Sequence, residues 1–286
     1  MVGWLVVNTF MDSQKFKSLY ELLSASFQKH GVTLFIKRAQ DISLEVGKAL
    51  IDKPDFAIFW DKDIYLAERL EQNGIRLFNS SNSINLCDNK ILMYQELSNS
   101  NIKIPRTFIA PKTFEGLGYK QRDFLNAVIS ETSFPIVVKE AYGSFGEQVY
   151  LANNFEELNA IIDRLGHKDF LLQEYVASSK GRDVRINVVG DRVIVSMLRE
   201  NKNDFRSNIS NGGTGTAFEP NDDYKELAIK AARALGLSFA GVDVLFGKDG
   251  PIICEVNSNP QFASTLKATN VNLADYIADY ILRQVC

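Results

Sequence analysis

Cysteine and histidine are scarce in this sequence of 286 residues, which has three of the first and two of the second. The cysteines have neither paired nor metal-type spacing, so a disulfide framework is disfavoured and a reducing environment is expected. Neither histidine stands beside a candidate Ser or Cys nucleophile, which argues against a hydrolase triad.

An excess of basic residues is also missing. Lys and Arg number 32 against 35 Asp and Glu, and the formal net charge is -3. A nucleic-acid-binding surface usually shows a basic excess, so we expect no nucleic-acid partner. No segment approaches the roughly 20 apolar residues of a membrane span, and the first residues lack the basic region and apolar run of a signal peptide. We therefore expect a cytoplasmic protein with no membrane partner.

Short apolar runs alternate with amphipathic stretches in the first part of the chain. The predicted strands are 5–8, 32–36, 56–60 and 76–78, and the predicted helices are 13–29, 44–52 and 65–73. Strand–helix alternation of this kind favours a parallel sheet with right-handed crossovers.

A predicted helix at 88–98 leads to Pro105, beyond which the pattern changes. Strands are predicted at 136–139, 148–151 and 170–175, hairpins at 185–198 and 241–257, and helices at 155–165, 222–235 and 273–284. The fold class is therefore a parallel α/β unit followed by mixed, largely antiparallel α+β units. The length exceeds one small core. We predict an N-terminal α/β subdomain at 1–85, a linker helix with a central subdomain at 86–181, and a C-terminal subdomain at 182–286.

The most informative segment is the predicted hairpin at 241–257. If residues 248–250 form a three-residue loop, counting outward places Asp243 directly across from Glu255. Opposed residues have Cβ atoms about 5 Å apart on one sheet face. Asn257 points to the same face as Glu255, because side chains alternate along a strand. Three oxygen ligands therefore converge from otherwise apolar strands.

Paired carboxylates of this kind repel each other unless one takes up a proton or a cation lies between them. Asp243, Glu255 and Asn257 offer hard oxygen donors, which favour magnesium or manganese. No His or Cys contributes, so zinc is disfavoured. The alternative is a pair of solvated carboxylates at a strand edge.

Phosphate binding by a known glycine motif is excluded, because neither Gly-x-x-x-x-Gly-Lys-Ser/Thr nor Gly-x-Gly-x-x-Gly occurs. Instead, Lys139 ends an apolar strand and is followed by a loop that contains Gly143 and Gly146. Backbone N–H groups of such a loop can cover phosphate oxygens while the lysine supplies charge. A plain glycine turn after a strand would look similar.

Two further segments carry polar groups suited to a nucleotide. Residues 173–176 end an apolar strand, where backbone groups can pair with an adenine edge; an ordinary core strand that reaches the surface is the alternative. Arg206 has short polar neighbours at 207–208, and its guanidinium suits phosphoryl oxygens because it makes bidentate contacts. The alternative for Arg206 is a solvated loop arginine.

The order of these motifs along the chain resembles the RimK-type branch of the ATP-grasp superfamily. The resemblance is strongest from residue 170 to residue 272 and extends in outline over the whole chain. The motifs that carry it are Val-Val-Lys139, the 143–146 loop, Gln173-Glu174-Tyr175, Gly181-Arg-Asp183-Val-Arg185, Asp204-Phe-Arg206-Ser-Asn208, Gly241-Val-Asp243 and Glu255-Val-Asn257.

The resemblance implies the three-part ATP-grasp fold, with ATP held between the central and C-terminal subdomains. It implies two Mg²⁺ (or Mn²⁺) ions held by Asp243, Glu255 and Asn257, and it is compatible with a homo-oligomer. Arg206 and Lys139 would be catalytic. The implied ATP-binding residues are Lys90, Lys139, Gly143, Ser144, Phe145, Gly146, Gln173, Glu174, Tyr175, Val176, Asp183, Arg206, Ser207 and Asn208.

The implied activity is the ATP-dependent joining of a carboxylate to an amine through an acyl phosphate. The substrate would be an amino acid, a peptide or a protein terminus, with glutamate as an example of the added amino acid. Gln261 and Phe262 depart from the family pattern, and we expect them to shape the acceptor pocket. An ATP-dependent kinase and a non-catalytic nucleotide-binding module are the alternatives. The complete set of Asp243, Glu255, Asn257 and Arg206 argues against the last, because binding alone does not require it.

Overall fold

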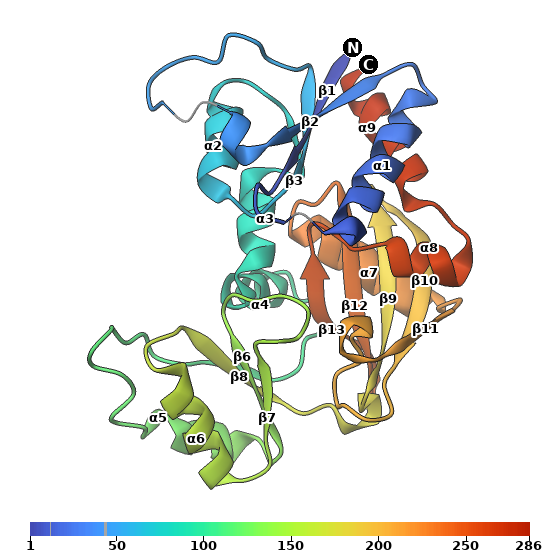
Figure 1. Cartoon of the computed structure of the whole chain (residues 1–286). Coiled ribbons are helices and arrows are strands. Elements are labelled where there is room, and N and C mark those ends of the chain that lie inside the picture. Colours follow the sequence, from blue (N-terminus) through green and yellow to red (C-terminus); the bar gives the residue numbers. More distant parts are fainter. Residues whose placement is uncertain (12, 43–44) are drawn as a thin grey trace.

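The computed structural model describes residues 1–286 except Asp12, Ser43 and Leu44, and its strands form three sheets (Figure 1). The first sheet takes its strands from residues 2–78, the second from 107–174 and the third from 182–257. No helix within the described ranges is long and apolar enough to span a membrane.

The first sheet is parallel and has the strand order β2-β1-β3-β4. Its central strands are buried on both faces, because one face packs on α1 and the other on α2. The predicted α/β unit is therefore confirmed. The elements are β1 (Val2–Val7), α1 (Gln14–Gln28), β2 (Thr33–Arg38), the 3₁₀ turn η1 (Ala39–Asp41), β3 (Phe56–Trp60), α2 (Ile64–Gln72) and β4 (Leu77–Phe78).

The helix predicted at 44–52 is wrong. Leu44 lies outside the described residues, and no helix occurs from Glu45 to Asp52. Gly47 has a φ of 85°, a left-handed value that a right-handed helix cannot contain. The amphipathic pattern of this stretch therefore reflects a loop that packs Leu50 against the first subdomain.

The helix predicted at 88–98 begins slightly later, and another helix precedes it. The two are α3 (Ser81–Asp88) and α4 (Lys90–Asn99), and α3 has no counterpart in the sequence prediction. Asn89 separates them, because its side-chain oxygen accepts hydrogen bonds from the Ile91 and Leu92 amides at 2.9 and 3.3 Å. This N-cap fixes the start of α4.

The second sheet is antiparallel, with the order β5-β8-β6-β7, and it has a core of its own. Its helices bury Leu125 and Leu158 against Phe170 of the sheet. Figure 1 places this part at the lower left, apart from the two other sheets. The elements are β5 (Thr107–Ile109), α5 (Phe124–Glu131), β6 (Ile136–Glu140), β7 (Val149–Ala152), α6 (Phe155–Leu165) and β8 (Phe170–Glu174).

The third sheet is also antiparallel, with the order β11-β10-β9-β12-β13. It contains both predicted hairpins, and α7 covers one of its faces. The elements are η2 (Ala177–Ser179), β9 (Arg182–Val189), β10 (Arg192–Glu200), η3 (Ile209–Asn211), β11 (Thr214–Ala217), α7 (Asp222–Ala234), β12 (Phe239–Gly247), β13 (Gly250–Asn257), α8 (Ala263–Thr269) and α9 (Leu273–Val285).

The first and third sheets share a hydrophobic core, because α9 returns to pack on α1 (Figure 1). Ser26 and Lys29 on α1 both donate to the Asp275 carboxylate on α9, at 2.7 and 2.6 Å. Trp60 at the end of β3 stacks on Phe239 of β12 with ring centroids 5.5 Å apart. The first and third sheets are thus packed together through one core. The glycine loop at 143–146, which connects β6 and β7 of the second sheet, lies against them.

Candidate active site

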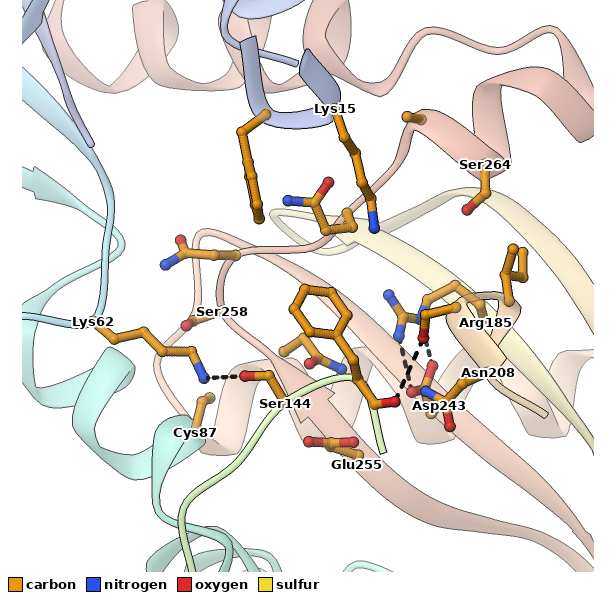
Figure 2. A pocket seen from close by; sticks show the side chains of 18 of the residues that line it. Lys15, Lys62, Cys87, Ser144, Arg185, Asn208, Asp243, Glu255, Ser258 and Ser264 are labelled. Carbon is orange, nitrogen blue, oxygen red and sulfur yellow. Dashed lines mark hydrogen bonds and ion pairs between the residues drawn. The ribbon is translucent and has the colours of Figure 1, made fainter. Parts of the chain in front are cut away.

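A cavity of about 390 Å³ lies where the three parts of the chain meet (Figure 2). Lys15 and Lys62 enter it from the first part, and Ser144 of the glycine loop enters it from the second. Asp243 and Glu255 form its floor on the third sheet. The cavity therefore brings the predicted metal ligands and the predicted phosphate loop together.

The β12–β13 hairpin places Asp243 opposite Glu255, as predicted. The route to this pairing differs from the prediction, because Gly247 pairs with Gly250 and the turn has two residues instead of three. An irregularity between Asp243 and Val244 restores the register by adding one residue on β13. Such a bulge re-aims side chains at a sheet edge, which is where this site lies.

Two buried arginines hold the Asp243 carboxylate. Arg185 contacts both carboxylate oxygens, with Nη2 2.9 Å from Oδ2, and Arg199 Nη2 lies 2.9 Å from Oδ2. Arg199 also pairs with Asp183, at 2.7 and 2.5 Å. Burial acts to raise the pKa of Asp243, but the charges of Arg185 and Arg199 outweigh it and hold that pKa below the ordinary value. The four side chains form a buried network of alternating charge.

The oxygen donors beside this network fit a hard divalent cation. The Glu255 side chain is 29% exposed, and its charged neighbour is Lys90, whose Nζ lies 3.5 Å from Oε1. Asn257 uses its amide N–H, not its oxygen, in a 3.3 Å bond to the Gly241 carbonyl. A carboxylate has about four lone-pair sites, so Asp243 retains capacity beside its arginines. Donors of this chemistry suit Mg²⁺, and the Glu255 carboxylate is more exposed than that of Asp243.

The two predicted ATP-contacting lysines are both buried. Lys90 Nζ donates to the Gly143 carbonyl at 2.9 Å, which ties α4 to the glycine loop. Lys139 Nζ lies 2.8 Å from the Tyr94 hydroxyl and 3.9 Å from Cys254 Sγ. Burial acts to lower the pKa of Lys139, but its polar neighbours raise it above the ordinary value, so the amine stays cationic. Both lysines therefore place positive charge close to Glu255.

The glycine loop is held against the other two parts of the chain. Arg206 Nη1 donates to the Gly146 carbonyl at 2.6 Å, and Asn211 Nδ2 donates to the Phe145 carbonyl at 3.3 Å. Lys62 Nζ donates to Ser144 Oγ at 3.2 Å (Figure 2). These bonds hold the loop closed over the cavity floor, an arrangement that would exclude water.

Gly146→Ala should weaken this closure. Gly146 has a φ of 77°, and an added Cβ would lie 2.7 Å from Asn208 Oδ1. A side chain in a left-handed conformation costs about 1–2 kcal/mol, so we expect turnover to fall about five- to thirtyfold. Gly74→Ala is the matched control, because Gly74 has a φ of 79° and open space around it. Equal turnover in the two variants would contradict a closing role for the loop.

Asp204 should stabilise the fold in a pH-dependent way. Its hydrogen bond with Arg206 holds the pKa of Asp204 below the ordinary value of 3.8. Because the folded pKa is depressed, the contribution is present above the unfolded pKa and is lost as pH falls through the folded one. At neutral pH, the free energy of unfolding measured in urea should be higher for wild type than for Asp204→Asn by less than about 1 kcal/mol. A difference that persists in strong acid would contradict this origin.

The structure divides the predicted site residues into two groups. The cavity is lined by Gly143, Ser144, Phe145, Asn208, Asp243, Glu255 and Asn257. The other predicted residues do not line it; they are Lys90, Lys139, Gly146, Gln173, Glu174, Tyr175, Val176, Asp183, Arg206 and Ser207.

The predicted adenine-contacting residues surround the end of β8. Gln173 Nε2 donates to Thr107 Oγ1 at 2.8 Å, and the Tyr94 hydroxyl links Gln173 to Lys139. The same hydroxyl donates to the Cys254 carbonyl, directly before Glu255. Through Tyr94, these contacts connect Gln173 and Lys139 to the strand that carries Glu255.

Several cavity residues were not predicted from the sequence. They are Asn8 after β1, Lys15 on α1, and the adjacent Asp61 and Lys62 after β3, which form no motif. Arg199 could not be found by counting along the predicted hairpin, because a tight turn at Gly190 and Asp191 would pair Asp183 with Leu198. A register shift between Val193 and Val195 pairs Asp183 with Arg199 instead.

The expectation that Gln261 and Phe262 both shape the pocket is half right. Gln261 lines the cavity, whereas Phe262 is fully buried and packs on Trp60 with ring centroids 6.2 Å apart. An aromatic ring at this position serves the core shared by the first and third sheets.

The sheet arrangement and the carboxylate-bearing hairpin define an ATP-grasp ligase. The solved RimK-domain ATP-grasp protein of Sphaerobacter thermophilus superposes with a TM-score of 0.77 at 19% identity, covering 98% of this chain and 99% of that one. Residues 87–281 match the family described as RimK-like ATP-grasp domain. The chain therefore belongs to the RimK-like ATP-grasp family.

Two curated relatives extend this assignment along the sequence. An uncharacterised protein of Mycoplasma pneumoniae is 34% identical over 89% of this chain and 90% of its own length. Human N-acetylaspartylglutamate synthase A is 35% identical over 82% of this chain and 59% of its own length. The similarity thus includes most of the chain and is not confined to the matched domain.

Proposed function

We propose that the chain uses ATP and Mg²⁺ to form an amide bond between a carboxylate and an amine. The supporting observation is the cavity in which the Asp243–Glu255 strand edge faces a closed glycine loop. The amino acids, peptides and protein termini expected from the sequence are the proposed substrates. Glutamate is the first to test, because the human relative is an N-acetylaspartylglutamate synthase.

The reaction would proceed by transfer of the γ-phosphoryl group of ATP to a carboxylate oxygen of the substrate. The acyl phosphate has a good leaving group, so an amine attacks its carbonyl carbon and phosphate departs with the oxygen. Asp243, Glu255 and Asn257 would hold Mg²⁺, which supplies charge neutralisation on the phosphates when bound. Lys90, Lys139 and Arg206 would add fixed positive charge around the transferring group.

The test is a screen of pairs of amino acids and short peptides with ATP and Mg²⁺. Phosphate release and mass spectrometry of the products are measured together. Ligation predicts ADP, phosphate and an amide product that requires both partners. A kinase would instead leave the phosphoryl group on a product without any need for an amine, and a binding module would release no phosphate. Either of these outcomes would refute the proposal.

A further inference from the structure

One wall of the cavity carries buried polar atoms that no other described residue satisfies. Asp61, directly after β3, is 6% exposed. Its Oδ1 accepts hydrogen bonds from Asn8 Nδ2 at 3.0 Å and from the Lys62 amide at 2.7 Å. Its Oδ2 is buried and has no partner in the described part of the chain. A buried acceptor left without a donor costs about 1–3 kcal/mol, and more when charged.

Two amide oxygens belong to the same wall. Asn259 Oδ1 and Gln261 Oε1 are also buried without partners among the described residues, and both side chains line the cavity. Asn259 is fixed in place because its Nδ2 donates to the Asp61 carbonyl at 3.0 Å. That bond orients the amide and identifies its oxygen as the unused atom. Asp61, Asn259 and Gln261 therefore place three buried oxygen acceptors without described partners in this wall of the cavity.

An ammonium group matches these acceptors better than a divalent cation does. It supplies three N–H donors and a single positive charge, which the single carboxylate of Asp61 balances. Sites for divalent cations in proteins generally use more carboxylate ligands. Burial raises the pKa of Asp61, opposed by its hydrogen bond with Asn8, so a bound cation would favour the ionised carboxylate. The neighbouring Lys62 ammonium does not fill this place, because it pairs with Asp88.

We infer that Asp61, Asn259 and Gln261 form a subsite for the α-ammonium group of an amino-acid substrate. The identity of the reaction rests on the proposed function, whereas the subsite rests on the unpaired oxygens. An ammonium at this site becomes a nucleophile only after it loses a proton, so binding as an ammonium does not decide which partner of the reaction is activated. The subsite orients one amino-acid substrate by its amino group.

The inference is tested by comparing amino acids with their desamino counterparts. Calorimetry in the presence of ADP and Mg²⁺ measures the binding of each common amino acid. Those that bind are compared with the acid that lacks the amino group, such as glutarate for glutamate or succinate for aspartate. Wild type should bind the amino acid at least about tenfold more tightly. Asp61→Asn should abolish this preference and leave the affinity for the desamino acid unchanged.

Asp63→Asn is the matched control, because it removes a neighbouring negative charge outside the cavity lining. Asp63 caps α2 by accepting from the Leu66 amide at 3.0 Å, and asparagine can retain that bond. The Asp63→Asn variant should prefer the amino acid over its desamino counterpart as strongly as wild type does. If Asp61→Asn does not fold, Gln261→Leu tests the same wall and should weaken amino-acid binding about fivefold.

Three results would overturn the inference: equal affinity of wild type for both acids, preserved selectivity in folded Asp61→Asn, or no binding by any amino acid. Unchanged affinity of the Gln261→Leu variant for the amino acid would also overturn the inference. The proposed function fails separately. If no amide product forms but amino-acid selectivity depends on Asp61, the subsite is supported and the proposed reaction is refuted. If an amide product forms but selectivity does not depend on Asp61, the reaction is supported and the subsite is refuted.

Discussion

Arg206→Ala should lower turnover by about 10²–10³-fold while changing ATP affinity much less. Arg206 is held by Asp204 at 3.0 and 2.7 Å, and its remaining Nη1 reaches the Gly146 carbonyl. We propose that a guanidinium fixed in this way stabilises charge as the phosphoryl group transfers, and its bond to the Gly146 carbonyl also holds the glycine loop. Both effects act more strongly on the transition state than on bound ATP.

The measurement is a steady-state rate with the amide product as readout, alongside an independent titration of nucleotide binding. Arg164→Ala serves as the matched control in the central subdomain, because Arg164 is exposed and lies over the Tyr150 ring at 4.7 Å. It should leave both quantities near their wild-type values. Equal losses of turnover and ATP affinity in Arg206→Ala would contradict the proposed role.

Asp243→Asn should destabilise the fold by about 3–5 kcal/mol, because it leaves two buried guanidinium groups without their shared carboxylate. Arg185 and Arg199 are only 8% and 6% exposed, so solvent compensates poorly for the lost charge. Arg199 would retain Asp183, whereas Arg185 has no other carboxylate partner among the described residues. Urea unfolding followed by circular dichroism measures the difference.

Glu255→Gln separates this structural effect from the chemical one. Glu255 is partly exposed and has one lysine at 3.5 Å, so its replacement should change stability by less than about 1 kcal/mol. Turnover should nevertheless fall at least as far as in Arg206→Ala, because the variant removes a carboxylate that we propose as a metal ligand. If the two variants lose equal stability, the buried arginine network does not depend on Asp243 as described.

The core of the site could be predicted because a hairpin imposes simple geometry. Alternation along β12 and β13 was enough to place Asp243 and Glu255 on one face. The turn length was wrong by one residue, and the bulge beside Asp243 compensated for it. Local patterning thus identifies which side chains meet, whereas bulges depend on packing that a single strand does not reveal.

The wall formed by Asp61, Asn259 and Gln261 could not be predicted in this way. Asp61 follows a strand of the first sheet, while its amide neighbours follow β13, almost two hundred residues later. They meet because the first and third sheets share a core, which is a property of the whole chain. The missing helix at 44–52 has a more local cause, since of its described residues Leu50 alone packs on the first subdomain while Val46 and Ile51 are exposed, so no apolar helix face is buried there.

The packing of α9 on α1 also bears on how the chain is made in the cell. A ribosome releases β1, α1 and β3 long before α9, so Leu23 and Phe27 must wait for the partners that cover them. Apolar surface exposed during synthesis is where aggregation and chaperone binding begin. The first sheet is completed by a helix that is made much later in synthesis, so the α9-facing side of α1 stays uncovered until α9 has been made.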